Sequence, residues 1–562
     1  MPKTVGIGLQ DFRKIRDLNA FYIDKTKFIP EWWESKDEVT LITRPRRFGK
    51  TLMMSTVENF FSVDHADESL FESLEVWNHM EYRQLQGTYP VIMLSFSDIK
   101  ENSYQEVRSK ICESIVDLYN HYDFLARGEL LNDREKEYFY KVSSDMSDSE
   151  VSISLRRLSG YLYKYYGKKT IILLDEYDTP MLEAYTGGYW DELVTFTRSL
   201  FNAAFKNNPY LERAILTGIT RISKESIFSD LNNLKVVTTT SEEYADCFGF
   251  TEDEVFSALD EYGMSEQKQE VKNWYDGFTF GSLTDIYNPW SIINFLDTGK
   301  FQTYWANTSS NHLANELIQQ GSKDIKADFE NLLRGEPIET QLDEQIIYEQ
   351  LDERESAVWS LFLASGYLKV VKTEFLMQTG RTIYSLSLTN REVRIMFENM
   401  IHGWFADYDS GYNDFVRALL QSDLKAMNVY MNRVAVSTFS FFDTGRKPSQ
   451  GTEPERFYHG FVLGLIVELE DRYSITSNRE SGFGRYDVIL EPYDPKDKAF
   501  IMEFKVRDPE DEKDLSATVQ SAIRQIDDKK YDTVLSAKGF PAERIKKYGF
   551  AFQGKKVLIG CE

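Results

Sequence analysis

Short apolar runs alternate with amphipathic stretches along roughly the first 240 residues of the chain. The runs are rich in β-branched residues, and the stretches between them repeat apolar side chains at three- and four-residue spacing. The apolar runs occupy residues 38–43, 89–96, 170–176, 213–220 and 235–240. Because strands buried on both faces appear as continuous apolar runs, and helices supply the crossovers between them, this pattern predicts a parallel α/β sheet.

From about residue 250 to 440 the apolar positions follow a mostly helical period. Within this region, residues 357–371, 381–388 and 390–401 predict a helix, a pair of hairpin strands and a second helix, an order that suits a small winged-helix-like unit. The sequence here shows no cluster of His, Cys or closely spaced acids with metal-ligand spacing. We therefore expect a lid and an interaction surface and no second active site.

The polar, turn-rich segment Asp443–Glu455 is the best candidate for an interdomain linker. Beyond it the pattern predicts one compact α/β unit. Its expected elements are a helix at 454–470, strands at 473–480, 484–492 and 499–506, a helix at 515–529 and a strand at 555–561. The predicted organisation is an α/β parallel-sheet P-loop domain at residues 1–245, a helical middle region at 246–445 and a small α/β domain at 446–562.

The segment that follows the first apolar run has the pattern of a phosphate-binding loop. RPRRFGKT joins a predicted strand to a predicted helix, with Gly49, Lys50 and Thr51 at the start of the helix. In such a loop the backbone amides bind phosphate, the lysine reaches the β/γ oxygens and the hydroxyl ligates Mg²⁺. The usual first glycine, five positions before Gly49, is Arg44 here. The alternative is a GKT tripeptide at an ordinary helix start.

A pair of acids lies at the end of another apolar run. In IILLDE, four apolar residues precede Asp175 and Glu176, the Walker B arrangement, in which the first acid holds the Mg²⁺ shell and the second activates water. A third run ends in Thr217, Thr220 and Arg221, where a polar group could contact the γ-phosphate. The alternatives are solvated or helix-capping acids, and a threonine that merely ends a strand.

Two carboxylates and an ammonium group are expected to converge in the C-terminal unit. Asp487 precedes Glu503-Phe504-Lys505 by sixteen residues, and strand alternation puts Glu503 and Lys505 on one face. Oxygen ligands of this kind hold Mg²⁺ or Mn²⁺, while the lysine orients water or stabilises developing charge. An isolated carboxylate would be costly in the apolar strand AFIMEFKV, so the rival explanation is a structural Glu503–Lys505 ion pair.

These segments occur in an order that resembles a known bacterial family. RPRRFGKT together with FYIDKTKFI, LLDEYDTP, LTGITRIS, WYDGF, YNPWSI and YWANTS is similar to AAA-ATPase-like proteins that carry a C-terminal PD-(D/E)XK nuclease-like domain. The resemblance covers nearly the whole chain, and in that family an arginine-rich phosphate loop is normal. It departs at Thr389, where a proline is expected.

The resemblance implies roles for further residues. Nucleotide contacts are implied for Arg44, Arg46 and Arg47 in the loop and for Asp24 and Lys25, which from the residues alone predict only a turn. It matches Asp487, Glu503 and Lys505 to the nuclease motif, and adds Gln525 on the following helix. Glu480, Arg485, Glu455 and His459 are further candidates for that site. The residues Trp274–Gly277 favour an aromatic helix end terminated by glycine. The residues Tyr287–Trp290 favour packing and a helix start.

Charge and composition narrow the expected partners. The formal net charge is −25, but residues 446–562 are nearly neutral, with 20 Lys and Arg against 21 Asp and Glu, so a local nucleic-acid contact is compatible with the acidic total. The three cysteines are scattered and no apolar run is long enough to cross a bilayer, so we expect a cytoplasmic protein without disulfides or a membrane segment. A protein partner or self-association is compatible with the aromatic-rich middle region.

The sequence thus predicts an ATP- and Mg²⁺-dependent ATPase coupled to a metal-dependent nuclease that acts on DNA or RNA, in a setting such as defence or mobile-element control. The alternative is a nucleotide-dependent switch or binding module with a catalytically silent nuclease-like domain.

Overall fold

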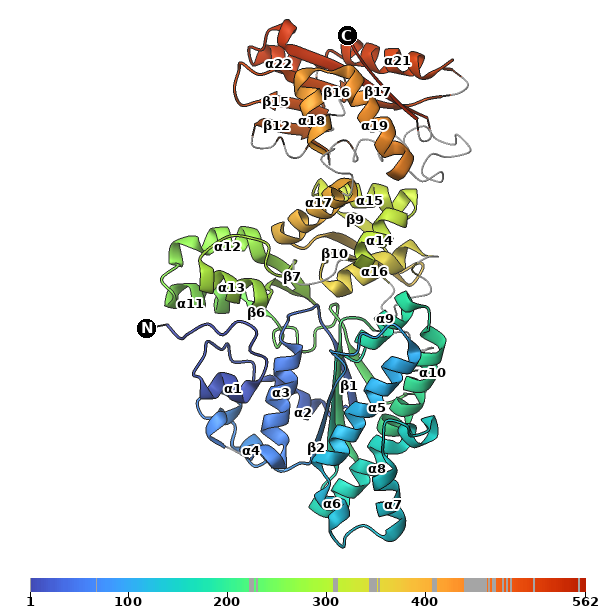
Figure 1. Ribbon diagram of the computed structural model, residues 1–562. Coiled ribbons are helices and arrows are strands. Elements are labelled where there is room, and N and C mark those ends of the chain that lie inside the picture. The colour runs from blue at the N-terminus through green and yellow to red at the C-terminus, as the bar shows by residue number, and fades with distance from the viewer. Residues whose placement is uncertain are drawn as a thin grey trace. The chain divides into compact units, whose positions relative to one another are not determined.

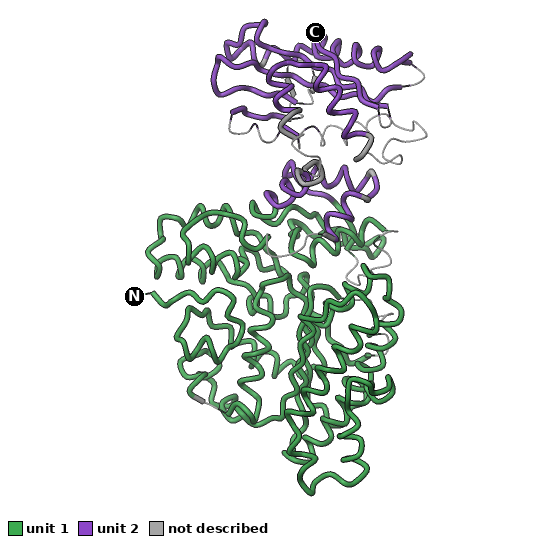
Figure 2. Tube along the Cα trace, viewed as in Figure 1, with its two compact units in different colours: residues 1–310, 339–393 green, residues 311–338, 394–562 purple. Residues whose placement is uncertain are grey.

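The computed structural model divides the chain into two compact units, each described here by itself (Figures 1 and 2). Unit 1 comprises residues 1–310 and 339–393, and unit 2 comprises residues 311–338 and 394–562. The structure describes residues 2–562 except 67, 222–226, 229–230, 307–311, 343–350, 352–353, 407–411, 439–461, 463–464, 467–468, 470–471, 478–479, 482–483, 486–487, 509–510 and 554–555. The two units group the chain differently from the three predicted domains, whose boundaries stay a prediction.

Unit 1 is built on a five-stranded parallel sheet (Figure 1). Its strands are β1 Val39–Thr43, β2 Val91–Ser95, β3 Thr170–Asp175, β4 Leu211–Gly218 and β5 Leu234–Val237, in the order β2-β3-β4-β1-β5. The predicted parallel α/β sheet is therefore confirmed, with a strand in each of the five apolar runs. In this order β4 lies between the strand that precedes the phosphate loop and the strand that ends in Asp175.

Helices cover both faces of this sheet (Figure 1). The helices in this part of the chain are α1 Phe12–Asp17, α2 Phe28–Ser35, α3 Lys50–Phe61, α4 Met80–Arg83, α5 Tyr104–His121, α6 Phe124–Arg127, α7 Asp133–Lys141, α8 Asp148–Tyr166, α9 Thr179–Gly187 and α10 Trp190–Phe201. Apolar residues of α3 such as Met54 and Val57 pack with Leu173 and Ile215 of the sheet in one buried cluster. This packing holds the start of α3 at the carboxyl ends of the strands.

The rest of unit 1 follows the sheet in sequence. It contains α11 Glu252–Glu261, α12 Lys268–Tyr275, a small sheet in the order β6-β8-β7, α13 Pro289–Thr298, α16 Glu355–Ser365, β10 Leu368–Leu376 and β11 Arg381–Leu388. The small sheet is formed by β6 Phe250–Thr251, β7 Asp276–Phe280 and β8 Leu283–Tyr287. The predicted order of helix, hairpin and helix is confirmed by α16, β10–β11 and α17 Arg391–Ala406.

The end of α12 differs from the prediction. The helix does end at Tyr275, but Gly277 belongs to β7 and does not terminate the helix. Its φ is +132°, and a Cβ built on it would lie 2.0 Å from the carbonyl oxygen of Thr389. Gly277 is therefore required for a close approach between two backbone segments.

Unit 2 contains a mixed five-stranded sheet. Its strands are β12 Tyr473–Ser477, β15 Val488–Pro492, β16 Ala499–Val506, β17 Ile545–Gln553 and β18 Lys556–Cys561, in the order β12-β15-β16-β17-β18. Strand β17 was not predicted; it pairs parallel with β16 and antiparallel with β18. Further helices and strands of this unit are α14 His312–Gln320, α15 Lys323–Leu333, α18 Tyr412–Gln421, α19 Leu424–Thr438, β13 Glu480–Ser481, β14 Gly484–Arg485, α21 Leu515–Asp528 and α22 Thr533–Ala537. Strand β9 Ile338–Thr340 lies in the sheet of order β10-β11-β9.

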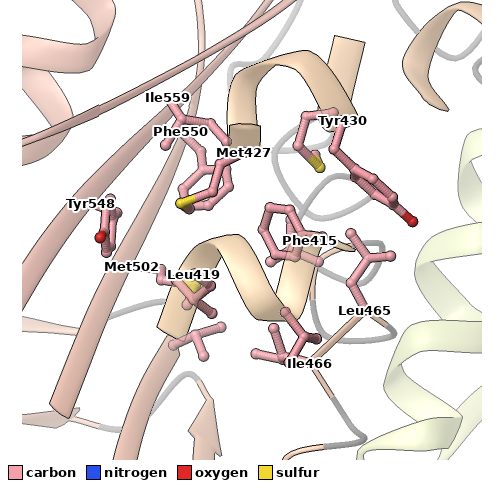
Figure 3. Close-up of a cluster of buried hydrophobic side chains, with 14 of the residues drawn as sticks. Phe415, Leu419, Met427, Tyr430, Leu465, Ile466, Met502, Tyr548, Phe550 and Ile559 are labelled. Carbon is pink, nitrogen blue, oxygen red and sulfur yellow. The ribbon is translucent and has the colours of Figure 1, made fainter. Parts of the chain in front are cut away.

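Helices α18 and α19 complete the core of this unit. Phe415 and Leu419 of α18 and Met427 of α19 lie in one buried cluster with Met502 of β16 and Phe550 of β17 (Figure 3). The opposite face of the sheet is covered by α21, whose Ile526 packs with residues of β16 in a second cluster. The described residues that build this unit therefore begin well before the predicted boundary at residue 446.

Two asparagines on α19 bind the backbone of β18, the last strand in the sheet order. Asn428 donates its side-chain amide to the carbonyl of Ile559 (2.8 Å) and accepts the N–H of the same residue (2.8 Å). Asn432, one helical turn on, makes the same pair of bonds with Val557 (2.6 and 3.0 Å). Two asparagines four positions apart on the helix thus bind the backbone N–H and C=O groups of two residues that are two positions apart on the strand. They take the place of the hydrogen bonds that a neighbouring strand would make.

Candidate functional site

The phosphate loop is formed by the residues between β1 and α3. Gly49 occupies the position before the helix with φ +82°, a left-handed conformation that strains any residue with a Cβ. Lys50 is buried, and its Nζ donates to the carbonyls of Arg44 (2.9 Å) and Pro45 (2.9 Å). Burial lowers the pKa of Lys50, while Glu176 and Asp175 act in the opposite direction. The lysine is therefore held beside the two acids.

The acid at the end of β3 contacts both neighbouring elements. Asp175 is fully buried; its Oδ2 accepts the hydroxyl of Thr51 on α3 at 2.7 Å, and its Oδ1 accepts the hydroxyl of Thr217 on β4. Burial raises the pKa of Asp175, and the two hydroxyl hydrogen bonds oppose that rise. The structure thus brings together the hydroxyls of Thr51 and Thr217 and the carboxylate of Asp175, as predicted. Hydroxyl and carboxylate oxygens are the ligands that Mg²⁺ prefers, so Thr51 and Asp175 fit a magnesium site.

Glu176 is held in an unusual backbone conformation. Its φ is +51°, which is uncommon for a residue with a side chain and is typically found at functional sites. The N–H of Glu176 donates to the hydroxyl of Thr217 (3.3 Å), and its Oε2 accepts the hydroxyl of Thr179 (3.2 Å). The predicted catalytic carboxylate therefore lies beside Asp175, with its side chain oriented by the first residue of α9.

A buried acid that the motif reasoning did not assign organises the segment after β4. Oδ2 of Asp178 accepts the N–H groups of Ile219 and Thr220 (both 2.8 Å) and the hydroxyl of Thr220 (3.0 Å). The hydroxyl of Tyr177 donates to the carbonyl of Thr220 (2.8 Å). These bonds fix the chain between Thr217 and the half-buried Arg221. The signal was present in LLDEYDTP, as a further acid three residues after Asp175.

The three arginines of the loop have different environments. Arg44 is fully buried, and its guanidinium donates to backbone carbonyls, including that of Thr238 (2.7 Å), and lies 4.4 Å from the ring centre of Phe280. Burial lowers the pKa of Arg44 to about 10. This placement favours a structural role over the implied nucleotide contact. Arg46 and Arg47 are exposed, and the Arg47 guanidinium lies 4.5 Å from the ring centre of Trp290.

An apolar pocket adjoins the loop at Gly49. Its lining is mostly apolar and comes from the N-terminal segment, the start of α3 and α13: Gly6, Leu9, Ile15, Phe21, Tyr22, Ile23, Lys25, Phe48, Gly49, Leu52, Met53, Thr56, Cys247, Gly249, Phe250, Pro289 and Ile293. Lys25 adds a charged group, which donates to Glu254 (2.7 Å) and to the carbonyl of Asp246 (2.8 Å). Asp24 instead accepts the N–H (2.9 Å) and hydroxyl (2.7 Å) of Thr26, which is the turn predicted from the residues alone.

In unit 2, Glu503 of β16 and Gln525 of α21 are in contact where the helix covers the strand. Glu503 on β16 is 3% exposed, and its Oε1 accepts the side-chain amide of Gln525 on α21. Lys505 follows at the next position on the same face and is half-buried. Gly549 of β17 lies opposite Glu503, and a Cβ there would lie 2.8 Å from the carbonyl of Val519 on α21. The absence of a side chain at Gly549 lets α21 lie close to the strand that carries Glu503.

The remaining residues of the predicted nuclease site lie outside the described residues. These are Asp487, Glu455 and His459, together with the side chains of Glu480 and Arg485. Val488, the residue after Asp487, pairs with Met502, the residue before Glu503. The described strands β15 and β16 are thus neighbours, and the metal-binding role of Asp487 stays a prediction.

An acidic cluster in unit 1 was not expected. Carboxylates of Glu252, Asp276 and Asp285 lie within 4.8 Å of one another, contrary to the expectation that this region holds no closely spaced acids. Lys272 donates to Asp285 (2.9 Å) and to Glu252. Burial and the nearby Asp285 raise the pKa of Asp276 to about 7. The cluster combines acids that are distant in sequence, which is why spacing did not reveal it.

Comparisons with known proteins match two separate regions of the chain. Residues 6–228 match the family model described as predicted AAA-ATPase, and residues 453–562 match the PD-(D/E)XK nuclease superfamily. An uncharacterized protein from the vnfD 5′ region of Azotobacter chroococcum mcd 1 is 24% identical over 550 residues, which covers 96% of this chain and 95% of that protein. Among the described helices, none combines the length and apolar character needed to cross a bilayer. The N-terminal region is thus similar to a predicted AAA-ATPase, and the C-terminal region is similar to the PD-(D/E)XK nuclease superfamily.

Proposed function

We propose that the N-terminal region binds and hydrolyses ATP. The observation that carries this proposal is the contact between Thr51 and Asp175, which joins the phosphate-loop helix to the acidic strand beside a buried Lys50. Lys50 would bind the β/γ oxygens, and Thr51 and Asp175 would hold Mg²⁺, which neutralises charge on the phosphates. Glu176 would orient the attacking water, and Thr217 would keep the Asp175 carboxylate in place.

The apolar pocket beside Gly49 suits the nucleobase of the same nucleotide. A ligand site of this kind is mostly apolar with a few polar groups, and the pocket shares Gly49 with the phosphate loop. A base in the pocket would place the phosphates at the start of α3, where backbone N–H groups and the helix dipole favour an anion. Lys25 would act through Glu254 by tying the N-terminal segment to α11.

We further propose that the C-terminal unit is a metal-dependent phosphodiesterase that cuts DNA or RNA. The buried carboxylate of Glu503, its amide partner Gln525 and the nearby Lys505 support this reading. Glu503 and Asp487 would hold Mg²⁺ or Mn²⁺, which supplies an activated water and stabilises charge on the scissile phosphate. Lys505 would stabilise the developing negative charge. Defence or mobile-element control is the biological setting that we propose for an ATPase joined to such a nuclease.

Cutting of labelled DNA and RNA by the purified chain tests the proposal. Reactions would contain Mg²⁺ or Mn²⁺, with and without ATP, and would compare the wild type with Glu503→Gln and the control Glu491→Gln. Glu491 is a carboxylate of the same unit that pairs with Lys538 on the surface (2.5 Å). We expect cleavage by the wild type and the control and a loss of at least about 100-fold in Glu503→Gln. Nucleic-acid binding without any cleavage would instead support a nucleotide-dependent switch with a silent nuclease-like domain.

A further inference from the structure

The carbonyl of Arg46 is a fixed point of the phosphate loop. It accepts the side-chain amide of Asn288 (3.2 Å) and the indole N–H of Trp305 (3.0 Å). The two preceding carbonyls of the loop both accept Lys50. Because a peptide group is planar, holding the Arg46 carbonyl also fixes the direction of the next N–H, that of Arg47. Asn288 and Trp305 thereby orient the Arg47 N–H, one of the backbone donors of the loop.

Trp305 is held in turn by a buried carboxylate. Glu392 is fully buried in the first turn of α17; its Oε1 accepts the N–H groups of Trp305 (2.6 Å) and Ala306 (3.4 Å), and its Oε2 accepts the hydroxyl of Ser291 (2.8 Å). A buried carboxylate is tolerated only when it is hydrogen-bonded in this way, and an acid is favourable at a helix N-terminus. Removing its charge would therefore disturb the backbone that carries the indole.

The first turn of α17 has a second contact with the same region. Asn390 accepts the N–H of Val393 as the cap of the helix (3.0 Å) and donates to the carbonyl of Tyr275 (3.2 Å). Helix α17 is continuous from Arg391 to Ala406, and its residues from Arg394 onward belong to unit 2. One helix therefore begins on the residues that hold the phosphate loop and continues into the unit that carries the nuclease-like region.

We propose that Trp305 and Glu392 are positioning residues of the nucleotide site and that they connect the phosphate loop to α17. Neither residue contacts the loop's phosphate-binding groups directly; Trp305 acts through the Arg46 carbonyl, and Glu392 acts through Trp305. Nucleotide in the loop then stabilises the first turn of α17, and a change in α17 alters nucleotide affinity. This inference rests on the ATP binding proposed above, and it assigns a role to the YNPW and YWANTS segments.

The test compares Trp305→Phe with Trp274→Phe in the full chain. Phenylalanine keeps an aromatic ring at position 305 but removes the indole donor. Trp274 is the matched control, because its indole N–H donates to Glu270 on its own helix (3.0 Å), and phenylalanine would keep an aromatic ring beside Arg391 of α17. The loss of one hydrogen bond should weaken ATP binding about 3- to 10-fold in Trp305→Phe and leave the control unchanged. Glu392→Gln should also weaken ATP binding. If Glu392→Gln fails to fold, Ser291→Ala is measured in its place.

Hydrogen exchange of backbone amides is a second measurement, and a merely structural role of Trp305 would not change it in the way described next. Without nucleotide, the amides of residues 46–49 should exchange faster in Trp305→Phe than in the wild type or Trp274→Phe, which tests the positioning role independently of ATP binding. With saturating ATP, the amides of residues 305–306 and 391–395 should gain protection in the wild type and not in Trp305→Phe. Wild-type exchange at residues 46–49 in Trp305→Phe would overturn the inference. A wild type that binds no ATP would refute the proposed ATPase instead.

Discussion

Thr217 gives a sharp test of the proposed nucleotide site because its hydroxyl has two partners at the end of β3. It donates to Asp175 and accepts the N–H of Glu176 (3.3 Å), and it is 1% exposed. Valine has nearly the same shape as threonine but can neither donate nor accept. Thr217→Val therefore leaves Oδ1 of Asp175 without this donor and removes the acceptor for Glu176 in a buried site.

The expected magnitude follows from the charge of the partner. A hydrogen bond to an ionised group contributes about 1.5–3 kcal/mol, which corresponds to a loss of roughly 10- to 150-fold in kcat/KM at about 1.4 kcal/mol per tenfold. Steady-state phosphate release with Mg²⁺ and ATP measures this ratio. Thr197→Val on α10 is the control, because Thr197 is equally buried but donates to the carbonyl of Leu193 on its own helix (2.7 Å). Unchanged kcat/KM in Thr217→Val, at a melting temperature equal to that of the control, would refute the assigned role.

The remaining predictions concern both units. Lys50→Ala should weaken ATP binding by about 10- to 100-fold or more, which isothermal titration measures. Glu176→Gln should keep ATP binding but lower kcat by about 10²–10⁴-fold, which phosphate release measures. Lys505→Ala should leave metal binding in place and lower cleavage by about 10²–10³-fold, with ATP binding unchanged; stability lost in step with cleavage would favour the structural ion pair. The raised pKa of Asp276, about 7, means that the native chain holds a proton that the unfolded chain releases near pH 4. Stability should therefore fall as pH rises from about 4 to 7, and Asp276→Asn should reduce that fall in denaturant titrations across this range.

The parts of the fold that depend on local pattern were predictable. The central strands β1, β3 and β4 are almost wholly buried, so each appears as a continuous apolar run. The edge strands β2 and β5 are less buried but are also mostly apolar, and all five strands were predicted. The sequence also places Gly49 and Lys50 after the loop that follows β1, and Asp175 and Glu176 at the end of β3, so the carboxyl edge of the sheet brings them together. Strand β17 was missed because its sequence IKKYGFAFQ has two lysines directly after its first residue and contains Gly549, and both features weaken a strand pattern.

The parts that depend on contacts between distant residues were not predictable. Arg44 follows β1 directly, yet its side chain is directed to the carbonyl of Thr238, far along the chain. The roles of Asn288 and Trp305 depend on a loop carbonyl more than 240 positions away in sequence. A side chain's direction is decided by such tertiary contacts, so motif spacing alone could identify the residues of the loop but not what holds it.

The two asparagines on α19 have a practical consequence for dividing the protein. A fragment that begins at the predicted boundary, residue 446, would contain the mixed sheet but not α18 or α19. It would expose the backbone groups of Val557 and Ile559 that Asn432 and Asn428 now satisfy, and it would uncover the apolar face that packs against Phe415 and Met427. An open strand edge beside an apolar surface favours aggregation. An expression fragment for the nuclease-like unit should therefore begin before Tyr412. If a shorter fragment is insoluble, the cause would be the loss of α18 and α19 and not an unstable nuclease fold.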